Sequence, residues 1–299
     1  MITLIRQKTK PYSMELLFKT IGKSRQHYWQ LMSGKKRKEY FEDEIINIVS
    51  KWRKNHSKVG SRPLFHMIED SGVELGVGVN KFEQILRENH LTIGKIKSKM
   101  PRTSDGKGWN NYPNLTNGLQ LNDINQLIVS DITYYSIQGD WHYIFTLKDV
   151  YSQRVLGLVA SRSMKYENAL NCIEQMIKLR GKKNLKGCIH HTDNGSQYNA
   201  LAYVARLKEC KIKISRASSC QENGSSEQLN HIIKNMYFVG WKIDTFEDLQ
   251  KACKKFMFLN NHERAIKQLG YLSPVKFEEK IRMQKIEDRR IKTLYDFEK

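Results

Sequence analysis

The chain has 299 residues, of which 39% are hydrophobic, and its 51 Lys and Arg outnumber 31 Asp and Glu to give a formal net charge of +20. This composition excludes a disordered chain, and the length suits one catalytic domain with a smaller domain beside it. Residues 1–110 hold 22 basic and 11 acidic side chains, a net +11, which leaves +9 for the remainder. Because both parts are basic, we expect a polyanionic partner, and nucleic acid fits better than a membrane surface.

The cysteines and the apolar stretches bear on the cellular compartment. The five cysteines form no CxxC pair and no zinc-like spacing, so we expect reduced structural thiols: Cys172, Cys188, Cys210, Cys220 and Cys253. No stretch approaches the length needed to cross a bilayer, and the N-terminus lacks a sustained hydrophobic region. We therefore expect a cytoplasmic protein without a membrane partner.

In chain order, residues 13–33 come first and have the pattern of a helix-turn-helix. A short helix over 13–19, a turn at Gly22 and a second helix capped by Ser24 are predicted. Two helices joined by a glycine turn are also common in any helical protein, so a purely structural role stays open. The basic run 35–38 follows and predicts a charged connector, which either contacts phosphates or is simply solvated.

Further helices are predicted over 41–55, from Ser61 and from Asn80, because apolar residues recur there at three- and four-residue steps. We assign residues 1–95 to a helical, helix-turn-helix-like DNA-binding region. Apolar periodicity then disappears and basic residues alternate with Pro and Gly, so residues 96–120 are predicted to form a basic linker.

Beyond the linker, the pattern changes to three strand-like runs and then to alternating strands and helices. The strands are predicted near 126–135, 141–150, 154–161, 187–192 and 211–216, and the helices near 165–180, 199–210 and 225–238. This order predicts an α/β domain in which an antiparallel meander passes into alternating β and α units.

Three acids stand at unusual places in this pattern. Asp131 interrupts a run of β-branched and aromatic residues, although aspartate is depleted in strands. Asp193 lies where a short strand gives way to the Asn194-Gly195 turn, and Glu227 lies in the first turn of a predicted helix. Each acid alone has an ordinary structural explanation, such as a strand-edge carboxylate or a helix-dipole partner.

If the three acids converge, a divalent cation must offset their repulsion. Two unit charges 4 Å apart interact by about 4 kcal/mol at an effective dielectric near 20. Carboxylate oxygens are ligands suited to Mg²⁺ or Mn²⁺, and two such ions can promote phosphodiester cleavage. The acids therefore point to phosphoryl transfer on a nucleic acid.

The motifs around these acids occur in a fixed order and are joined by two more near the C-terminus. They read Asp131-Ile132-Thr133-Tyr134, His191-Thr192-Asp193-Asn194-Gly195-Ser196-Gln197-Tyr198, Glu222-Asn223-Gly224-Ser225-Ser226-Glu227, Asn260-Asn261-His262-Glu263-Arg264 and Leu269-Gly270-Tyr271-Leu272-Ser273-Pro274. Together they resemble the integrase-core transposases of the insertion-sequence-three family, specifically the product of the second reading frame. The resemblance covers most of the chain.

The resemblance implies a fold, an activity and a metal site. The fold is an RNase H-like mixed sheet over residues 121–285, preceded by the small all-α module and followed by a C-terminal tail, 286–299. The activity is DNA strand cleavage and strand transfer by a DDE-type enzyme. Asp131, Asp193 and Glu227 are the catalytic residues and bind two Mg²⁺ or Mn²⁺ ions.

The resemblance also implies DNA contacts and protein partners. Lys234 follows Glu227 by two helical turns and shares its face, and its family counterpart contacts DNA. We expect further DNA contacts from Arg264 and, in the N-terminal region, from Lys35, Lys36 and Arg37. The expected partners are the ends of a mobile element, target DNA, other copies of the chain and a product of an upstream frame. Such a protein is expected to associate with the nucleoid.

The alternative is a catalytically inactive DNA-binding protein derived from a transposase. A general RNase H-like nuclease is a third possibility, but it has no need of the helix-turn-helix region. The three carboxylates favour the enzyme.

Overall fold

The computed structural model describes residues 18, 22–94, 112–217 and 224–295. The chain divides into two compact units, residues 1–52 and residues 53–299, and each is described by itself. The helix predicted over 13–19 lies outside the described residues except for Phe18, which is helical. Within the described part of the chain, every helix is too short or too polar to cross a membrane.

The first unit is dominated by α3 (Arg25–Arg53), a helix of 29 residues. It begins after Ser24, whose hydroxyl accepts a hydrogen bond from the His27 amide at 3.1 Å, which confirms the predicted cap. The connector predicted at 35–38 is wrong, because α3 runs straight through it. Lys, Arg and Glu are good helix formers, and two ion pairs at i,i+4 spacing support the turn there: Lys35–Glu39 and Lys38–Glu42.

The second unit begins with two short helices, α4 (Ser61–Asp70) and α5 (Val79–Glu88). They pack through buried apolar faces, where the rings of Phe65 and Phe82 meet edge to face at 5.5 Å. Extended glycines precede both helices, so the predicted starts are correct within a residue, but neither Ser61 nor Asn80 is the N-cap residue.

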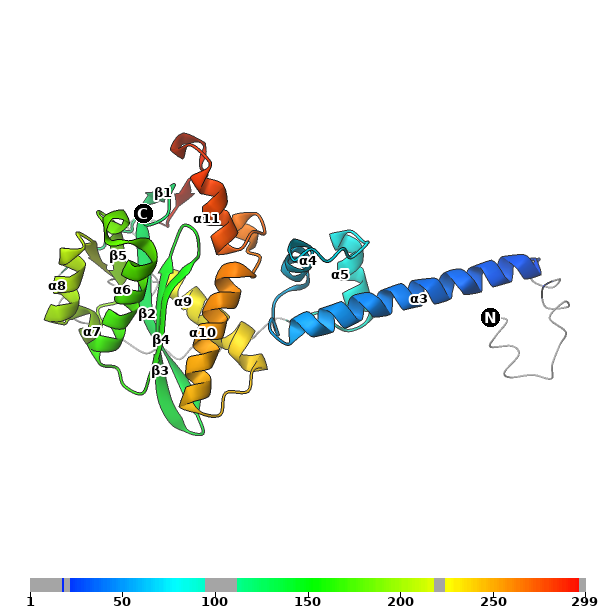
Figure 1. Cartoon of the computed structure of the whole chain (residues 1–299), viewed down its shortest axis with the longest axis horizontal. Coiled ribbons are helices and arrows are strands. Elements are labelled where there is room, and N and C mark those ends of the chain that lie inside the picture. Colours follow the sequence, from blue (N-terminus) through cyan, green and yellow to red (C-terminus); the bar gives the residue numbers. More distant parts are fainter. Residues whose placement is uncertain (1–17, 19–21, 95–111, 218–223, 296–299) are drawn as a thin grey trace. The chain divides into compact units, whose positions relative to one another are not determined.

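A five-stranded mixed sheet forms the centre of the second unit (Figure 1). Its strands are β2 (Leu127–Ile137), β3 (Asp140–Asp149), β4 (Val155–Ser161), β5 (Ile189–Thr192) and β6 (Lys213–Arg216). The order is β4-β3-β2-β5-β6, in which the first three strands are antiparallel and β5 and β6 run parallel to β2. This meander followed by parallel strands confirms the predicted α/β domain with a mixed sheet.

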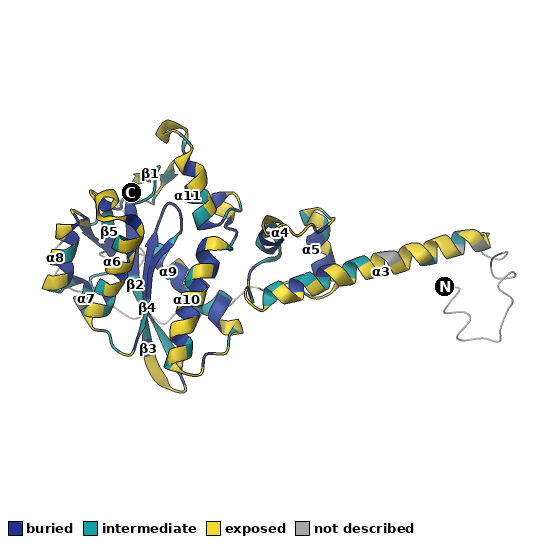
Figure 2. Cartoon of the chain, viewed as in Figure 1, coloured by how far each residue is buried: buried dark blue, intermediate teal, exposed yellow. Residues whose placement is uncertain are grey.

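Helices cover both faces of this sheet (Figures 1 and 2). One face carries α6 (Tyr166–Arg180), α7 (Ser196–Asn199) and α8 (Leu201–Glu209), and the other carries α9 (Gly224–His231) and α10 (Phe246–His262). A π-helical turn, η3 (Ile232–Tyr237), and a 3₁₀ turn, η4 (Phe238–Gly240), extend α9. The remaining elements are η1 (Lys182–Leu185), η5 (Lys267–Leu269), α11 (Pro274–Arg282) and η6 (Ile286–Asp288).

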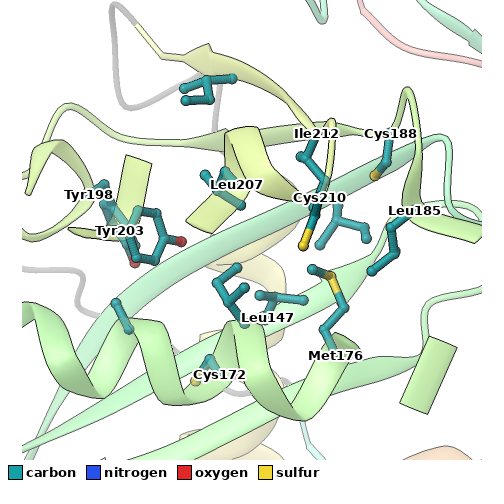
Figure 3. Close-up of a cluster of buried hydrophobic side chains, with 14 of the residues drawn as sticks. Leu147, Cys172, Met176, Leu185, Cys188, Tyr198, Tyr203, Leu207, Cys210 and Ile212 are labelled. Carbon is teal, nitrogen blue, oxygen red and sulfur yellow. The ribbon is translucent and has the colours of Figure 1, made fainter. Parts of the chain in front are cut away.

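The main core lies between the sheet and α6 and α8 (Figure 3). A Cβ atom at Gly157 would lie 2.7 Å from the Cys172 carbonyl oxygen, so glycine allows α6 to lie close against β4. Four of the five cysteines are buried free thiols, as expected: Cys172, Cys188, Cys210 and Cys253. Cys220 lies outside the described residues.

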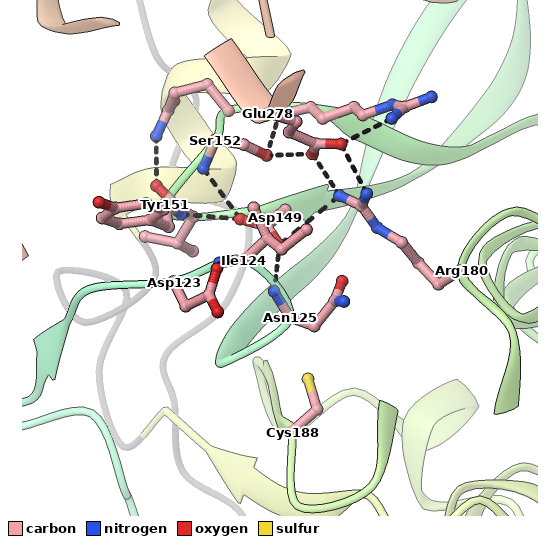
Figure 4. Close-up of polar contacts among 12 residues, drawn as sticks. Asp123, Ile124, Asn125, Asp149, Tyr151, Ser152, Arg180, Cys188 and Glu278 are labelled. Carbon is pink, nitrogen blue, oxygen red and sulfur yellow. Dashed lines mark hydrogen bonds and ion pairs between the residues drawn. The ribbon is translucent and has the colours of Figure 1, made fainter. Parts of the chain in front are cut away.

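A buried ion network ties α11 to the sheet and to α6 (Figure 4). Glu278 accepts hydrogen bonds from Ser152 at 2.7 Å, from Arg154 at 2.6 Å and from both terminal nitrogens of Arg180. Arg180 also lies 3.8 Å from Asp149, whose carboxylate accepts three backbone amides. Burial alone would raise the pKa of Glu278, but the two guanidinium groups outweigh burial and hold the pKa below its ordinary value.

A second, two-stranded sheet joins the segment before β2 to the segment after α11. β1 (Gln120–Leu121) pairs antiparallel with β7 (Lys292–Thr293). β1 therefore lies at the predicted end of the linker and β7 within the predicted C-terminal tail. The domain limits at 95, 120 and 285 stay predictions.

Glu278→Gln should lower the free energy of unfolding by about 3–5 kcal/mol, because it removes the carboxylate shared by the buried Arg180 and the partly buried Arg154. Since the folded-state pKa of Glu278 is depressed, its contribution is present above the unfolded pKa and is lost as pH falls through the folded value. Urea unfolding at pH 7 measures the change, with Glu174→Gln in the exposed Arg206 pair as the control. Equal effects of the two variants would contradict a special role for the network.

Candidate active site

The pairing of β2 with β5 brings the first two predicted acids to the same level of the sheet. The strands are parallel, and Val129 lies opposite His191. Continuing this register by two residues places Asp131 level with Asp193, which follows the last residue of β5. The expectation that Asp193 lies at a strand end is therefore correct.

The turn after β5 fixes the Asp193 carboxylate. Its Oδ1 accepts a hydrogen bond from the Gly195 amide at 3.1 Å, and the turn leads directly into α7. A Cβ atom at Gly195 would lie 3.1 Å from the same oxygen and 2.9 Å from Gln197 Oε1. A larger residue at this position would therefore press on the Asp193 carboxylate and on the end of the flexible Gln197 side chain, and both would have to shift slightly.

Arg216 stabilises this turn through hydrogen bonds to the α7 segment that follows it. Its side chain is fully buried at the end of β6, opposite Thr192, and donates to the Tyr198 carbonyl oxygen at 2.6 Å and to Asn199 Oδ1 at 3.3 Å. Burial raises the pKa of Asp193, whereas the Gly195 amide and the Arg216 charge oppose the rise. Arg216 thus holds α7 in place and partly offsets the Asp193 charge.

α9 packs against β2 and β3 and carries the third predicted acid, Glu227. One helical turn after it, Asn230 Nδ2 donates a hydrogen bond to Asp131 Oδ2 at 2.7 Å. Sequence analysis overlooked Asn230. The available signal was an amide three residues after Glu227 on the same helix, at a position that proves to be buried.

The Asp131 carboxylate has a strongly perturbed pKa. Burial, reinforced by the charges of Asp193 and Glu227, raises the pKa of Asp131 to about 7, although the Ile132 amide and Asn230 stabilise the ionised form. The three acids therefore lie near enough to influence the ionisation of Asp131. A perturbed acid among like charges is typical of a functional site.

The donor set suits a divalent cation. In the described part of the chain, no three His, Cys, Asp or Glu side chains are close enough together to be grouped as a metal site. However, carboxylate oxygens are the ligands that Mg²⁺ and Mn²⁺ prefer, and a cation would remove the penalty that raises the Asp131 pKa. These residues therefore fit a divalent metal ion.

Lys234 lies in η3, so the helix that connects it to Glu227 is wider than the regular helix assumed from the sequence. Burial lowers the pKa of Lys234, and the Asp131 charge opposes this fall. The half-buried ammonium is thus close enough to sense the Asp131 carboxylate.

The other predicted DNA contacts are Arg264 in the second unit and three residues of α3 in the first. Arg264 is half-buried, donates to Asn260 Oδ1 at 3.1 Å and has its pKa lowered by burial. On α3, the side chains of Lys35 and Lys36 are exposed, and that of Arg37 lies outside the described residues. The role of these four residues in DNA binding stays a prediction.

Asp131→Asn should raise the free energy of unfolding, measured in chelator at pH 8, by on the order of 2–4 kcal/mol. The raised folded-state pKa of Asp131 means that its ionisation costs stability, and this cost grows as pH rises from about 4 to about 7. Asp140→Asn, at the exposed start of β3, is the matched control. An Asp131→Asn variant no more stable than wild type at pH 8 would contradict this account.

Comparison with known proteins gives partial matches. Residues 122–220 match the family described as "Integrase core domain". A Mycobacterium tuberculosis protein named "Putative transposase for insertion sequence element IS986/IS6110" is 32% identical over 160 residues, 52% of this chain and 58% of that protein. The Shigella sonnei "Transposase for insertion sequence element IS629" is 31% identical over 157 residues, 51% of each chain. The chain thus spans little more than half the length of these relatives.

Among solved structures, the HTLV-2 integrase catalytic core domain in complex with magnesium matches with a TM-score of 0.42 at 18% identity. The match covers 55% of this chain and 99% of that one. The family match includes Asp131 and Asp193 and ends before Glu227.

Proposed function

We propose that this protein is a DDE-type transposase that cleaves DNA at the ends of a mobile element and transfers the strand to a target. The main support for this proposal is the register of β2 and β5, by which Asp131 lies level with Asp193. In addition, Glu227 on α9 lies near enough to raise the Asp131 pKa. The match to the integrase core family over residues 122–220 supports the same reaction class.

Asp131, Asp193 and Glu227 are proposed to hold two Mg²⁺ or Mn²⁺ ions. Bound ions of this kind supply activation of the attacking oxygen and stabilisation of the leaving oxygen in phosphodiester displacement. Asn230 orients the Asp131 carboxylate through the 2.7 Å hydrogen bond, and Arg216 holds the turn that presents Asp193.

The reaction has two displacements at phosphorus. Water first attacks a phosphodiester at the element end, the bond from phosphorus to the 3′ oxygen breaks, and the attacking water gives up a proton. The freed 3′-hydroxyl then attacks a target phosphodiester, forming one phosphorus–oxygen bond as another breaks. No covalent protein–DNA intermediate is needed, so the protein contributes positioning and charge stabilisation.

DNA is the proposed partner of both basic parts of the chain. Lys234, beside the Asp131 charge, is proposed to contact the phosphate next to the scissile bond. Arg264 and, on α3, Lys35, Lys36 and Arg37 are proposed to add further phosphate contacts.

The assignment to a particular family of mobile elements rests on the ordered motifs in the sequence. We assign the chain to the second reading frame of insertion-sequence-three elements, acting at the nucleoid. We further propose that it assembles as a homo-oligomer on DNA and can act with a product of the upstream frame.

Asp193→Asn should abolish Mg²⁺-dependent cleavage of element-end DNA without unfolding the protein. Loss of several kcal/mol of charge stabilisation corresponds to a rate at least ~100-fold lower. The measurement is single-turnover cleavage of labelled end DNA, with Asp140→Asn as the control that removes one carboxylate from β3. Undiminished Mg²⁺-dependent cleavage by purified Asp193→Asn would sink the assignment of Asp193 as a catalytic residue. Absence of cleavage by the wild-type protein would instead favour the non-catalytic DNA-binding protein.

Lys234→Ala should slow strand transfer on pre-cleaved end DNA by roughly 10–100-fold, since a hydrogen bond to a charged group contributes about 1.5–3 kcal/mol. Lys234→Arg should keep part of the activity because the charge remains, although its geometry differs. The half-saturating Mg²⁺ concentration should stay unchanged, because an ammonium cannot bind a cation. Lys254→Ala, an exposed lysine on α10, is the control. Equal transfer by both alanine variants would leave Lys234 an ordinary surface lysine.

A further inference from the structure

Lys148 is a buried lysine in β3 that the proposed reaction does not use. Its side chain is only 2% exposed. Its ammonium donates hydrogen bonds to the Ser225 carbonyl oxygen at 2.8 Å and to Gln153 Oε1 at 3.2 Å. Both acceptors are neutral oxygens, whereas buried ammonium groups usually require a carboxylate partner.

The surroundings of Lys148 make its charge unfavourable. Burial, reinforced by the charges of Lys292 and Arg264, lowers the pKa of Lys148 to about 7, and the Asp149 charge opposes this only in part. A hydrophobic side chain of similar length could fill the same space without this penalty. Stability alone therefore gives no reason for a lysine here.

The hydrogen bond to Ser225 gives Lys148 a geometric role. Ser225 lies in the first turn of α9, two residues before Glu227. On the same strand, two residues before Lys148, Thr146 donates a hydrogen bond to the Asp131 carbonyl oxygen at 3.2 Å. β3 therefore contacts the backbone of β2 at Asp131 through one side chain and the start of α9 through another.

We propose that Lys148 is a positioning residue that ties the first turn of α9 to β3 and so sets the placement of Glu227 relative to Asp131. The link to metal-dependent catalysis rests on the proposed function, whereas the link to α9 does not. Without the ammonium, the first turn of α9 loses its attachment to the sheet on this side, although the Asn230 contact with Asp131 remains.

The first test is hydrogen exchange of the full-length Lys148→Met variant, followed by mass spectrometry. Exchange of peptides over 224–231 should rise at least about tenfold, while peptides from α8 keep wild-type protection. The urea midpoint should not fall. Lys292→Met is the matched control. Lys292 is another largely buried lysine, and it donates a hydrogen bond to the Val150 carbonyl oxygen at 2.6 Å. It lies in β7 and does not contact α9 through this bond, so its substitution should leave exchange over 224–231 unchanged.

The second test separates positioning from general loss of structure. In Lys148→Met, the half-saturating Mg²⁺ concentration for cleavage should rise several-fold while the affinity for end DNA stays at the wild-type value. The glutamine side chain of Lys148→Gln is too short to reach Ser225, so this variant should show the same increase in exchange over 224–231. It keeps the test valid if the methionine variant does not fold.

Two outcomes would overturn the proposal: wild-type exchange over 224–231 in both variants, or a loss of protection spread evenly over the whole unit. If the wild-type protein shows no metal-dependent cleavage, the proposed function fails, and the exchange data still decide whether Lys148 positions α9.

Discussion

Parallel hydrogen bonding between β2 and β5 is the constraint on which the candidate active site depends. Parallel strands cannot be joined by a tight turn, so the chain passes through β3, β4 and α6 before it returns beside β2. β5 ends at Thr192, whereas β2 continues to Ile137. Asp131 therefore lies on a central strand at the point where its neighbour on one side stops. This explains how an aspartate within a strand comes to face a turn, a helix and other acids rather than a closed core.

The second unit contains two groups of buried charges, one around Glu278 and one around Asp131, and their pKa values shift in opposite directions. Around Glu278, two guanidinium groups and a serine satisfy the carboxylate, and its pKa falls below the ordinary value despite burial. Around Asp131, burial and two neighbouring acids raise the pKa, and the hydrogen bonds from the Ile132 amide and Asn230 oppose the rise without overcoming it. The compensated network ties α11 to the sheet, whereas the uncompensated one holds an excess of negative charge. Retaining that excess costs stability, and such a cost is typical of a functional site rather than of a purely structural one.

Much of this architecture follows from local sequence patterns, and the exceptions have physical causes. Apolar runs and turn residues predicted all five strands of the sheet and placed Asp193 at a strand end. The basic run at 35–38 was misjudged because a solvated charge cluster is equally compatible with a loop and with an exposed helix. Asn230 and Lys148 were overlooked because their partners lie 99 and 77 residues away in sequence. Nothing local to an amide or a lysine shows that folding will place it beside Asp131 or Ser225.

α9 is held in place by contacts that leave part of the Asp131 carboxylate open. Only eight residues form regular α-helix before the segment passes into η3, and so short an α-helix is not stable by its own propensity, so its placement depends on tertiary contacts. Beyond it, the Tyr237 hydroxyl at the end of η3 lies 3.1 Å from Nδ1 of the buried His56, whose Nε2 lies 2.8 Å from Glu263. At the sheet, Asn230 occupies only one of the four lone-pair positions of the Asp131 carboxylate, through Oδ2. Even with the Ile132 amide on a second position, other lone pairs of this carboxylate remain for the proposed cation. Asn230 can therefore hold the carboxylate in orientation, so α9 need not release Asp131 for the proposed metal ion to bind.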